Sequence, residues 1–429
     1  MPPPFESRLI IQLRHNPAKT AALVFVWMLA FTACSPGSPQ TTSYPQPSAT
    51  IFTAAQLGPT STPMPATPTQ IPGPPTPTVR PLDPVTEQDW IRGPVDAELS
   101  FLEYCDFQSP PCADLYENLE ALRAMHPDQI QLIYRQFPLL VLNDKAGLAA
   151  ELALAADAQG AFWQMHDRLF SQQQIWSDFT EDQFIEWAVE SADVIGLDRD
   201  QIASDLRQGK YTQAATDDFT RGISSGLPGT PFLLLNGEWF RTSPTLTNLE
   251  AAVRLELLEA MQYEQPPELE IDQGSLYYAH LMLNTGEVVI QLYPDSAPAA
   301  VANFIFLARR GWFDDTIFHR VVPGRYVEGG DPSATGLGGP GYFLPDEFDP
   351  ALEFDRPGRV AMANAGPDTN GSRFAITLQP MPEWQDAKTI IGQVVEGLSL
   401  VSELESRDPL DDLLTIPLVK IIKVEIEGQ

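Results

Sequence analysis

The chain has 429 residues, enough for two or three domains, and carries 57 acidic against 26 basic side chains, a formal net charge of −31. Such a charge repels nucleic acid and anionic lipid surfaces, so we expect neither as a partner. The three cysteines, Cys34, Cys105 and Cys112, are too few for a disulfide-rich scaffold, and no cysteine–histidine spacing indicates a metal site. We therefore expect no metal and no cofactor.

The first 33 residues are typical of an export signal. Basic residues precede the short apolar run Ala21–Phe31, which ends at Phe31-Thr32-Ala33-Cys34. Small residues directly before a cysteine resemble the lipobox of bacterial lipoproteins, although Phe31 replaces the usual leucine. The resemblance implies that residues 1–33 are a cleaved signal peptide and that Cys34 is lipidated. The alternative is an uncleaved signal anchor, and both place the remainder outside the cytoplasm.

Residues 34–85 are predicted to form a disordered tether, because they are rich in Pro, Thr, Ser and Gln and hold few large apolar side chains. At roughly 3.1 Å per residue, such a segment would reach on the order of 150 Å. This length would hold a folded body well clear of a membrane surface.

The first folded part is expected at residues 86–263. Alternating or apolar runs predict strands at Glu98–Tyr104 and Ile130–Phe137, with a helix at Ala113–Met125 between them. Helical periodicity then recurs at Leu148–Ala156, Phe162–Phe170, Glu181–Glu190, Arg199–Gln208 and Gln213–Ile223. Pro228–Gly237 reads as a turn, a strand and a hairpin turn, and Asn248–Met261 as a closing amphipathic helix.

This order of elements resembles the thioredoxin fold, in its disulfide-bond-forming, DsbA-like branch. The matching runs are Glu103–Gln108, Tyr134–Pro138, Phe162–Asp167 and Gly229–Pro231. The resemblance implies an α/β thioredoxin-like domain with a helical insertion. It also implies that Pro231 follows a cis peptide bond and faces the active thiols.

The redox motif of that family is altered in this sequence. Where the family has Cys-x-x-Cys, the chain reads Ser109-Pro110-Pro111-Cys112, and a serine hydroxyl cannot replace the attacking sulfur in thiol–disulfide exchange. Cys105 stands seven positions before Cys112. Three interpretations remain open: a structural Cys105–Cys112 disulfide, a displaced redox pair, or two free thiols in a domain retained for binding or spacing.

A short linker at residues 264–274 precedes the second folded part at residues 275–427. Strands are predicted at Tyr277–Leu283 and Val288–Leu292, and helices at Ala297–Ala308 and Leu398–Ser406. Many short strands with two helices favour a mainly β, closed antiparallel barrel that is capped at its ends.

Two runs in this part, Phe318–Asp331 and Met362–Phe374, resemble the signature of cyclophilin-type peptidyl-prolyl isomerases. The resemblance implies the cyclophilin barrel and proline-containing polypeptides as substrates. Rotation about an X-Pro bond crosses a barrier of about 18–20 kcal/mol, which comes from amide resonance. A donor to the amide nitrogen lowers this barrier in the twisted transition state, and the resemblance assigns this role to Arg320 as the catalytic residue.

The resemblance also implies a set of substrate-binding positions, with Asn364 contributing its backbone and Trp384 the pocket rim. These positions are Tyr326, Glu328, Ala363, Asn364, Arg373, Phe374, Ala375, Trp384, Gln385 and Thr389. Several positions depart from the family pattern: Arg325 and Ala375 replace pocket phenylalanines, Glu328 and Arg373 replace glutamines, Gln385 replaces a rim leucine, and Thr389 replaces a histidine. A Glu328–Arg320 ion pair would either hold the arginine firmly or draw it away from the amide.

The expected function is a lipid-anchored, extracytoplasmic bacterial isomerase that assists the folding of exported proteins. Two alternatives remain open. One is a thiol-disulfide oxidoreductase that uses Cys105 and Cys112, and the other is a non-catalytic binding or chaperone module with degenerate sites.

Overall fold

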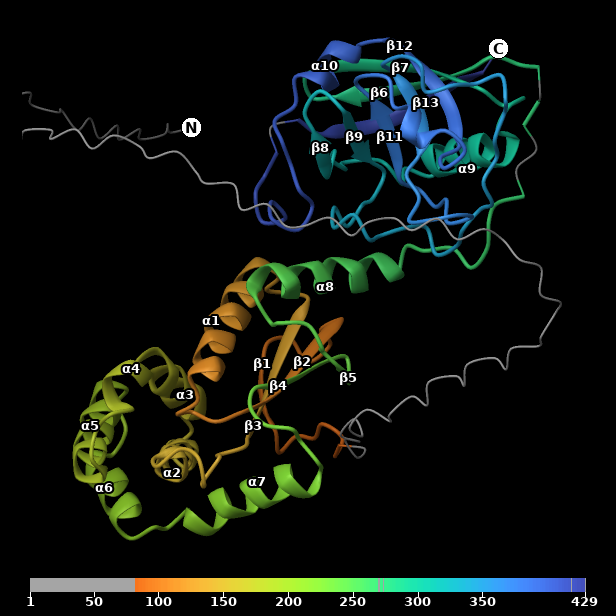
Figure 1. Ribbon diagram of the computed structural model, residues 1–429. Helices are drawn as coiled ribbons and strands as arrows, with labels where there is room; N and C mark the ends of the chain where they lie inside the picture. Colours follow the sequence, from red (N-terminus) through yellow and green to blue (C-terminus); the bar gives the residue numbers. More distant parts are fainter. Residues whose placement is uncertain (1–81, 269–270, 273, 418, 429) are drawn as a thin grey trace, which may run out of the picture. The chain divides into compact units, whose positions relative to one another are not determined.

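The computed structural model describes residues 82–268, 271–272, 274–417 and 419–428. They form two domains, each built on one sheet with its own hydrophobic core (Figure 1). The predicted signal peptide, Cys34 and nearly all of the tether lie outside the described residues. No helix in the described ranges is long and apolar enough to cross a membrane.

The first domain is built on a five-stranded sheet in the order β1-β3-β2-β4-β5. Its strands are β1 (Trp90–Arg92), β2 (Leu99–Cys105), β3 (Ile130–Gln136), β4 (Phe232–Leu235) and β5 (Glu238–Trp239). β2 and β3 are parallel and the other pairs are antiparallel. This is the predicted thioredoxin-like arrangement, to which the short edge strand β1 is an addition that the sequence analysis missed.

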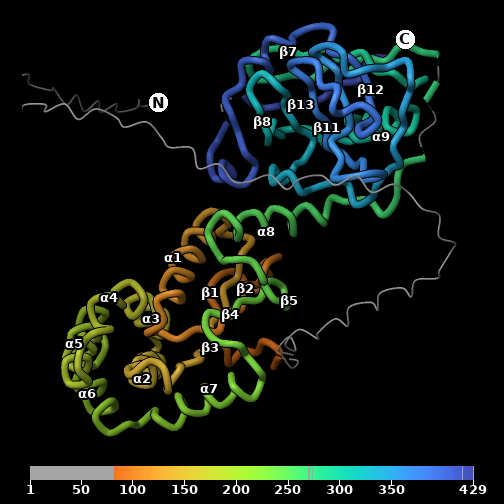
Figure 2. The backbone as a smooth tube through the Cα atoms, viewed as in Figure 1, coloured from red at the N-terminus to blue at the C-terminus, as the bar shows by residue number. Residues whose placement is uncertain are grey.

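Helices cover this sheet in the expected order. They are α1 (Pro110–Met125), α2 (Ala146–Asp157), α3 (Phe162–Ser171), α4 (Gln173–Trp176), α5 (Glu181–Val194), α6 (Arg199–Arg207), α7 (Thr212–Ser224) and α8 (Leu246–Glu259). The insertion α2–α7 runs between β3 and β4 (Figure 2). Two of its helices begin at a residue whose side chain caps the helix: Thr180 and Gln183 form a capping box on α5, and Asp198 caps α6. The four-residue α4 was not predicted.

Alternation along β2 explains why the sheet is covered on both faces. Leu99, Phe101 and Cys105 point into the core shared with α1, whereas Leu102 and Tyr104 belong to a smaller cluster on the opposite face. The sheet therefore has buried side chains on both sides, as an α/β fold requires.

The second domain is built on an eight-stranded antiparallel sheet in the order β13-β6-β7-β12-β10-β11-β9-β8. The strands are β6 (Tyr277–Leu283), β7 (Gly286–Leu292), β8 (Arg320–Val322), β9 (Tyr326–Gly329), β10 (Arg359–Met362), β11 (Phe374–Thr377), β12 (Ile390–Glu396) and β13 (Ile421–Gly428). The sheet curls, and a bridge pairs Thr316, just before β8, with Ile421 at the other end. The mainly β, barrel-like fold is confirmed.

Two α-helices accompany this sheet, α9 (Pro298–Arg309) and α10 (Leu398–Ser402), together with the short 3-10 helix η1 (Pro382–Trp384). The prediction that the second helix continues to Ser406 is wrong. Arg407 pairs with Val321 of β8 through both backbone hydrogen bonds, so the chain must become extended before it reaches that strand.

A cluster of phenylalanines fills the interior of the curled sheet. The ring of Phe374 on β11 lies 5.6 Å from that of Phe304, 5.8 Å from that of Phe313 and 6.5 Å from that of Phe318, centroid to centroid. Its side chain is fully buried. Phe374 therefore stabilises the fold on which the outer face of β11 depends.

We expect Phe374→Ala to lower the free energy of unfolding by about 3–5 kcal/mol, because it removes a buried ring and leaves a cavity. Urea unfolding followed by circular dichroism measures this. Phe343→Ala is the matched control: Phe343 is 67% exposed, so its loss should change stability by no more than about 0.5 kcal/mol. Equal effects of the two substitutions would contradict the assignment of Phe374 to the core.

Candidate active site

Strand register gathers the predicted site residues on the outer face of the second domain's sheet. Arg320 pairs with Glu328, Glu328 with Ala375, and Ala375 with Ala361, across β8, β9, β11 and β10. Paired residues of antiparallel strands point to the same face, with Cβ atoms about 4.5–5.5 Å apart. Residues far apart in the sequence thus form one row, with Arg320 at its end.

Glu328 is the centre of the charges in this row. Its carboxylate lies 3.3 Å from Nε2 of His319, 2.9 Å from Nη1 of Arg373 and 3.6 Å from Nε of Arg320. Burial by itself would raise the pKa of Glu328, but the His319 hydrogen bond and the charges of His319, Arg373 and Arg320 hold it below its ordinary value. Glu328 is therefore ionised, and the expected Glu328–Arg320 ion pair is present.

A second carboxylate reaches Arg320 from a distant part of the chain. Nη1 of Arg320 lies 3.4 Å from Oδ2 of Asp408. The bridge between Val321 and Arg407 places Asp408 beside β8. No motif or spacing in the sequence marks Asp408, an acid 88 positions after the arginine that it contacts.

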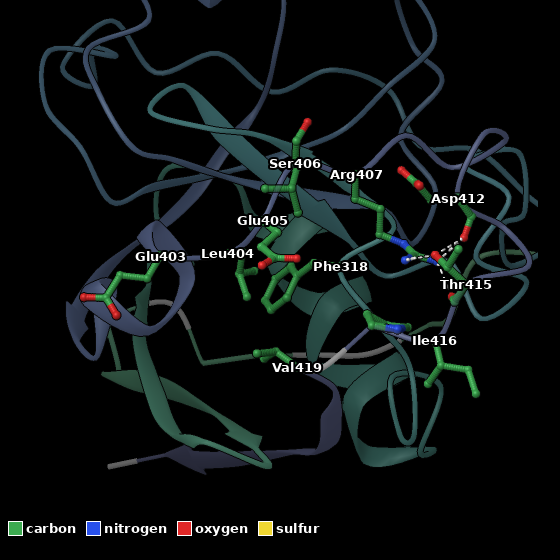
Figure 3. A pocket seen from close by; sticks show the side chains of 12 residues that line it. Phe318, Glu403, Leu404, Glu405, Ser406, Arg407, Asp412, Thr415, Ile416 and Val419 are labelled. Carbon is green, nitrogen blue, oxygen red and sulfur yellow. Dashed lines mark hydrogen bonds between the residues drawn. The ribbon is translucent and has the colours of Figure 1, made fainter. Parts of the chain in front are cut away.

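The guanidinium of Arg407 holds the segment that carries Asp408. It donates to the backbone oxygens of Asp412 and Thr415 and to the Thr415 hydroxyl, as Figure 3 shows. These residues line a cavity of about 390 Å³ together with Phe318 and Val321. Val321 lies next to Arg320 along β8 and so points to the opposite face. This cavity is therefore distinct from the row that holds Arg320.

An apolar surface lies beside the charged row. The rings of Tyr326 and Trp384 meet edge to face with centroids 5.0 Å apart, and Trp384 also contacts Phe354 at 5.7 Å. At the surface, Arg325 and Glu383 form an ion pair of 2.5 Å. The arginine that replaces a family phenylalanine is thus outside the apolar surface, which Tyr326 and Trp384 provide.

Asn364 follows β10, and its side chain and its backbone differ in their hydrogen bonding. Its side chain donates to the Ala387 carbonyl at 2.9 Å and accepts from Nζ of Lys388 at 3.2 Å. Burial lowers the pKa of Lys388 from its ordinary value. Within the described ranges, no protein group is hydrogen-bonded to the backbone N–H or C=O of Asn364. The side chain is anchored while the backbone stays free to pair with an extended chain.

Several predicted substrate-binding residues have side chains that are buried or hydrogen-bonded within the domain. Phe374 is in the core, as described above, and Thr389 is fully buried with its hydroxyl accepting from the Glu347 N–H at 2.9 Å. Ala363 and Ala375 are buried, and Gln385 donates to the Leu352 carbonyl at 3.3 Å. Ala375 is only 1% exposed, so neighbouring groups cover its methyl group.

Two family models match the chain. "Cyclophilin type peptidyl-prolyl cis-trans isomerase/CLD" matches residues 278–426, and "Thioredoxin" matches residues 85–254. The chain is 42% identical over 145 residues to "Peptidyl-prolyl cis-trans isomerase-like 1" of Gibberella zeae, covering 33% of this chain and 89% of the relative. The chain belongs to the cyclophilin-type peptidyl-prolyl isomerases.

Other relatives of the cyclophilin domain are similarly close. The human "Peptidyl-prolyl cis-trans isomerase-like 1" is 43% identical over 159 residues, 35% of this chain and 92% of the relative. "Peptidyl-prolyl cis-trans isomerase A" of Mycobacterium tuberculosis is 43% identical over 136 residues, 28% of this chain and 75% of the relative. The chain is therefore a peptidyl-prolyl cis-trans isomerase with proline-containing polypeptides as substrates, and it carries a thioredoxin-like domain before the cyclophilin domain.

The two cysteines of the thioredoxin-like domain are joined in a disulfide between the end of β2 and the start of α1. Both are buried, at 1% and 0% exposure, and Ser109 beside them is also buried. The Thr230–Pro231 bond is cis, as predicted, and continuing the β2–β4 register places Pro231 opposite Cys105. Thiol–disulfide exchange requires access to a sulfur, and buried sulfurs favour the structural interpretation of this bond.

Metal ligands are not grouped in the described part of either domain: no three His, Cys, Asp or Glu side chains there are placed to hold a metal ion. The chemistry available to the cyclophilin site is that of Arg320, its two carboxylate partners and the neighbouring apolar surface.

The network around Glu328 predicts a pH dependence of stability. Because the folded pKa lies below the ordinary 4.5, the unfolded state takes up the proton first as the pH falls. The stabilisation by ionised Glu328 is thus complete above about pH 4.5 and is lost as the pH falls through the folded pKa. We expect Glu328→Gln to destabilise the protein at neutral pH and to differ little from the unmodified chain at low pH.

Urea unfolding between neutral pH and about pH 3 measures this difference. Glu383→Gln is the matched control, since Glu383 is 51% exposed in its ion pair and should contribute little at any pH. A Glu328→Gln effect that stays constant across the range would show that the charge of Glu328 is not what stabilises the fold.

Proposed function

We propose that Arg320 catalyses isomerisation by donating to the amide nitrogen of the X-Pro bond. The supporting observation is its fixed position: Nε faces Glu328 and Nη1 faces Asp408, while in the described structure Nη2 has no hydrogen bond or ion pair. The side chain is 34% exposed, so a substrate can reach it. The two carboxylates thus contact two of the three guanidinium nitrogens and leave Nη2 for the substrate.

A substrate pose follows from the neighbouring groups. The free N–H and C=O of Asn364 would pair with the extended substrate backbone, and the proline ring would lie against Tyr326 and Trp384. As the amide twists, its nitrogen becomes pyramidal and gains a lone pair that accepts from Arg320. That hydrogen bond is strong only in the transition state, so it lowers the barrier rather than merely tightening binding.

We further propose that the protein acts outside the cytoplasm on exported polypeptides, tethered to a membrane through Cys34. The motivation is the apolar run that ends in Phe31-Thr32-Ala33-Cys34, followed by the proline-rich tether. A disulfide between Cys105 and Cys112 suits an oxidising compartment.

We expect Arg320→Ala to lower kcat/KM for a proline peptide about 100- to 1,000-fold, because it removes the donor to the transition state. Arg320→Lys keeps the charge but loses the forked donors, so it should recover only part of the rate. A protease-coupled assay with a Xaa-Pro peptide measures both.

Arg356→Ala is the control for this assay, since Arg356 is 60% exposed and pairs with Asp355, away from the row that holds Arg320. It should leave the rate unchanged. If the unmodified protein and Arg320→Ala are equally slow, at the uncatalysed rate, while the peptide still binds, then the domain is a binding module and the catalytic proposal is overturned.

The proposed location is tested with Cys34→Ser expressed in a bacterial host. The unmodified chain should sediment with membranes and carry a fatty-acyl mass increment at Cys34, whereas Cys34→Ser should carry none. An unmodified chain that is recovered unacylated in the cytoplasm would rule out the proposed anchor.

A further inference from the structure

The thioredoxin-like domain contains a cavity that neither the isomerase site nor the disulfide uses. It has a volume of about 540 Å³ and lies between the segment before β1, the end of β3, and helices α2 and α7. Ligand pockets in proteins typically measure about 300–1,000 Å³. Trp90, Tyr134 and Leu154 give the cavity an apolar part.

One side chain of this cavity lacks hydrogen bonds. Gln136, at the end of β3, is 5% exposed, and neither its amide nitrogen nor its amide oxygen has a partner in the described structure. A buried carboxamide without partners is unfavourable, because its N–H and C=O groups have lost their hydrogen bonds to water. A ligand with both a donor and an acceptor would give a partner to each of these atoms, and the backbone N–H and C=O of one extended residue point to the same side and offer this pair.

The charges of the cavity are unbalanced. Arg135 is held by Asp89 at 2.9 Å, and Arg221 by Asp218 at 2.9 Å, so both guanidinium groups are already paired. Asp83 and Asp217 also line the cavity, and among the described residues neither is in an ion pair. Four carboxylates against two guanidinium groups favour a cationic ligand over an anionic one.

We propose that this cavity binds a short basic segment of a polypeptide client. The backbone N–H and C=O of one residue of the segment pair with the Gln136 amide, and a lysine or arginine side chain lies near Asp83 and Asp217. The thioredoxin-like domain is then a second holding site for the polypeptides on which the cyclophilin domain acts. The inference rests on the proposed function in one respect, namely that the clients are unfolded or extended chains.

The probe is a proline-free peptide, N-acetyl-Ala-Lys-Ala-Lys-Ala-amide, titrated calorimetrically into the 429-residue chain. Because this peptide lacks proline, we do not expect it to bind the cyclophilin site. N-acetyl-Ala-Glu-Ala-Glu-Ala-amide is the matched acidic control, and methylammonium tests for a site that takes any small cation. We expect saturable binding of the lysine peptide, at least tenfold weaker binding of the acidic peptide, and no competition by methylammonium at equal concentration.

Two variants test the residues. Gln136→Leu roughly keeps the size of the side chain but removes both hydrogen-bonding groups. It should weaken binding of the lysine peptide roughly tenfold without lowering the midpoint temperature of unfolding. Ala214→Trp places a bulky ring on α7 at the cavity wall and should block binding. Ile223→Trp is its control, since Ile223 lies on the same helix, is 55% exposed and does not line the cavity.

The outcomes separate this inference from the isomerase proposal. Lysine-peptide binding that survives Arg320→Ala but is lost in Gln136→Leu and Ala214→Trp supports the cavity, whether or not the isomerase is active. Four results overturn it: no saturable binding, equal binding of the acidic peptide, full competition by methylammonium, or loss of binding in Arg320→Ala. Unchanged binding in both cavity variants would overturn it as well.

Discussion

The cyclophilin site depends on one buried carboxylate. Glu328 lies among an imidazole and two guanidinium groups, and its ionised state fixes the position of Arg320 on the adjacent strand. Arg320 and Arg373 are 34% and 19% exposed, so water would compensate them in part if Glu328 were removed, whereas His319 is fully buried. A buried carboxylate in place of the family's glutamine is tolerated here because Arg373 replaces a second glutamine and supplies the opposite charge.

The replacement of a glutamine by Glu328 changes the electrostatic environment of Arg320. A glutamine would hold Arg320 by neutral hydrogen bonds, whereas Glu328 and Asp408 surround it with two negative charges. The carboxylates fix the guanidinium, but they also weaken its field at the substrate nitrogen. Under the proposed mechanism, the rate of the isomerase depends on the balance between these two effects, and Asp408, which lies outside both family motifs, contributes to each.

The thioredoxin-like domain has a fold shared with redox proteins, but its two cysteines lie seven positions apart and not in a Cys-x-x-Cys arrangement. The disulfide joins β2 to α1 within the core, and both sulfurs are buried. What the domain offers to a partner is instead the cavity at the end of β3. A redox fold without an exposed thiol, joined to an isomerase, is consistent with a domain that contacts polypeptides without covalent chemistry.

The sequence by itself determined both folds, because periodicity, turn residues and two long motifs are local signals, and it marked Arg320 as the proposed catalytic residue. It also identified Glu328 as the charge beside the arginine. Tertiary structure alone decided the rest: that Phe374 faces the core while its neighbour Ala375 faces outward, that Asp408 contacts Arg320, and that Cys105 and Cys112 are bonded. The physical reason is that these outcomes depend on strand register and on the β8–Arg407 bridge, which join residues that no local pattern connects.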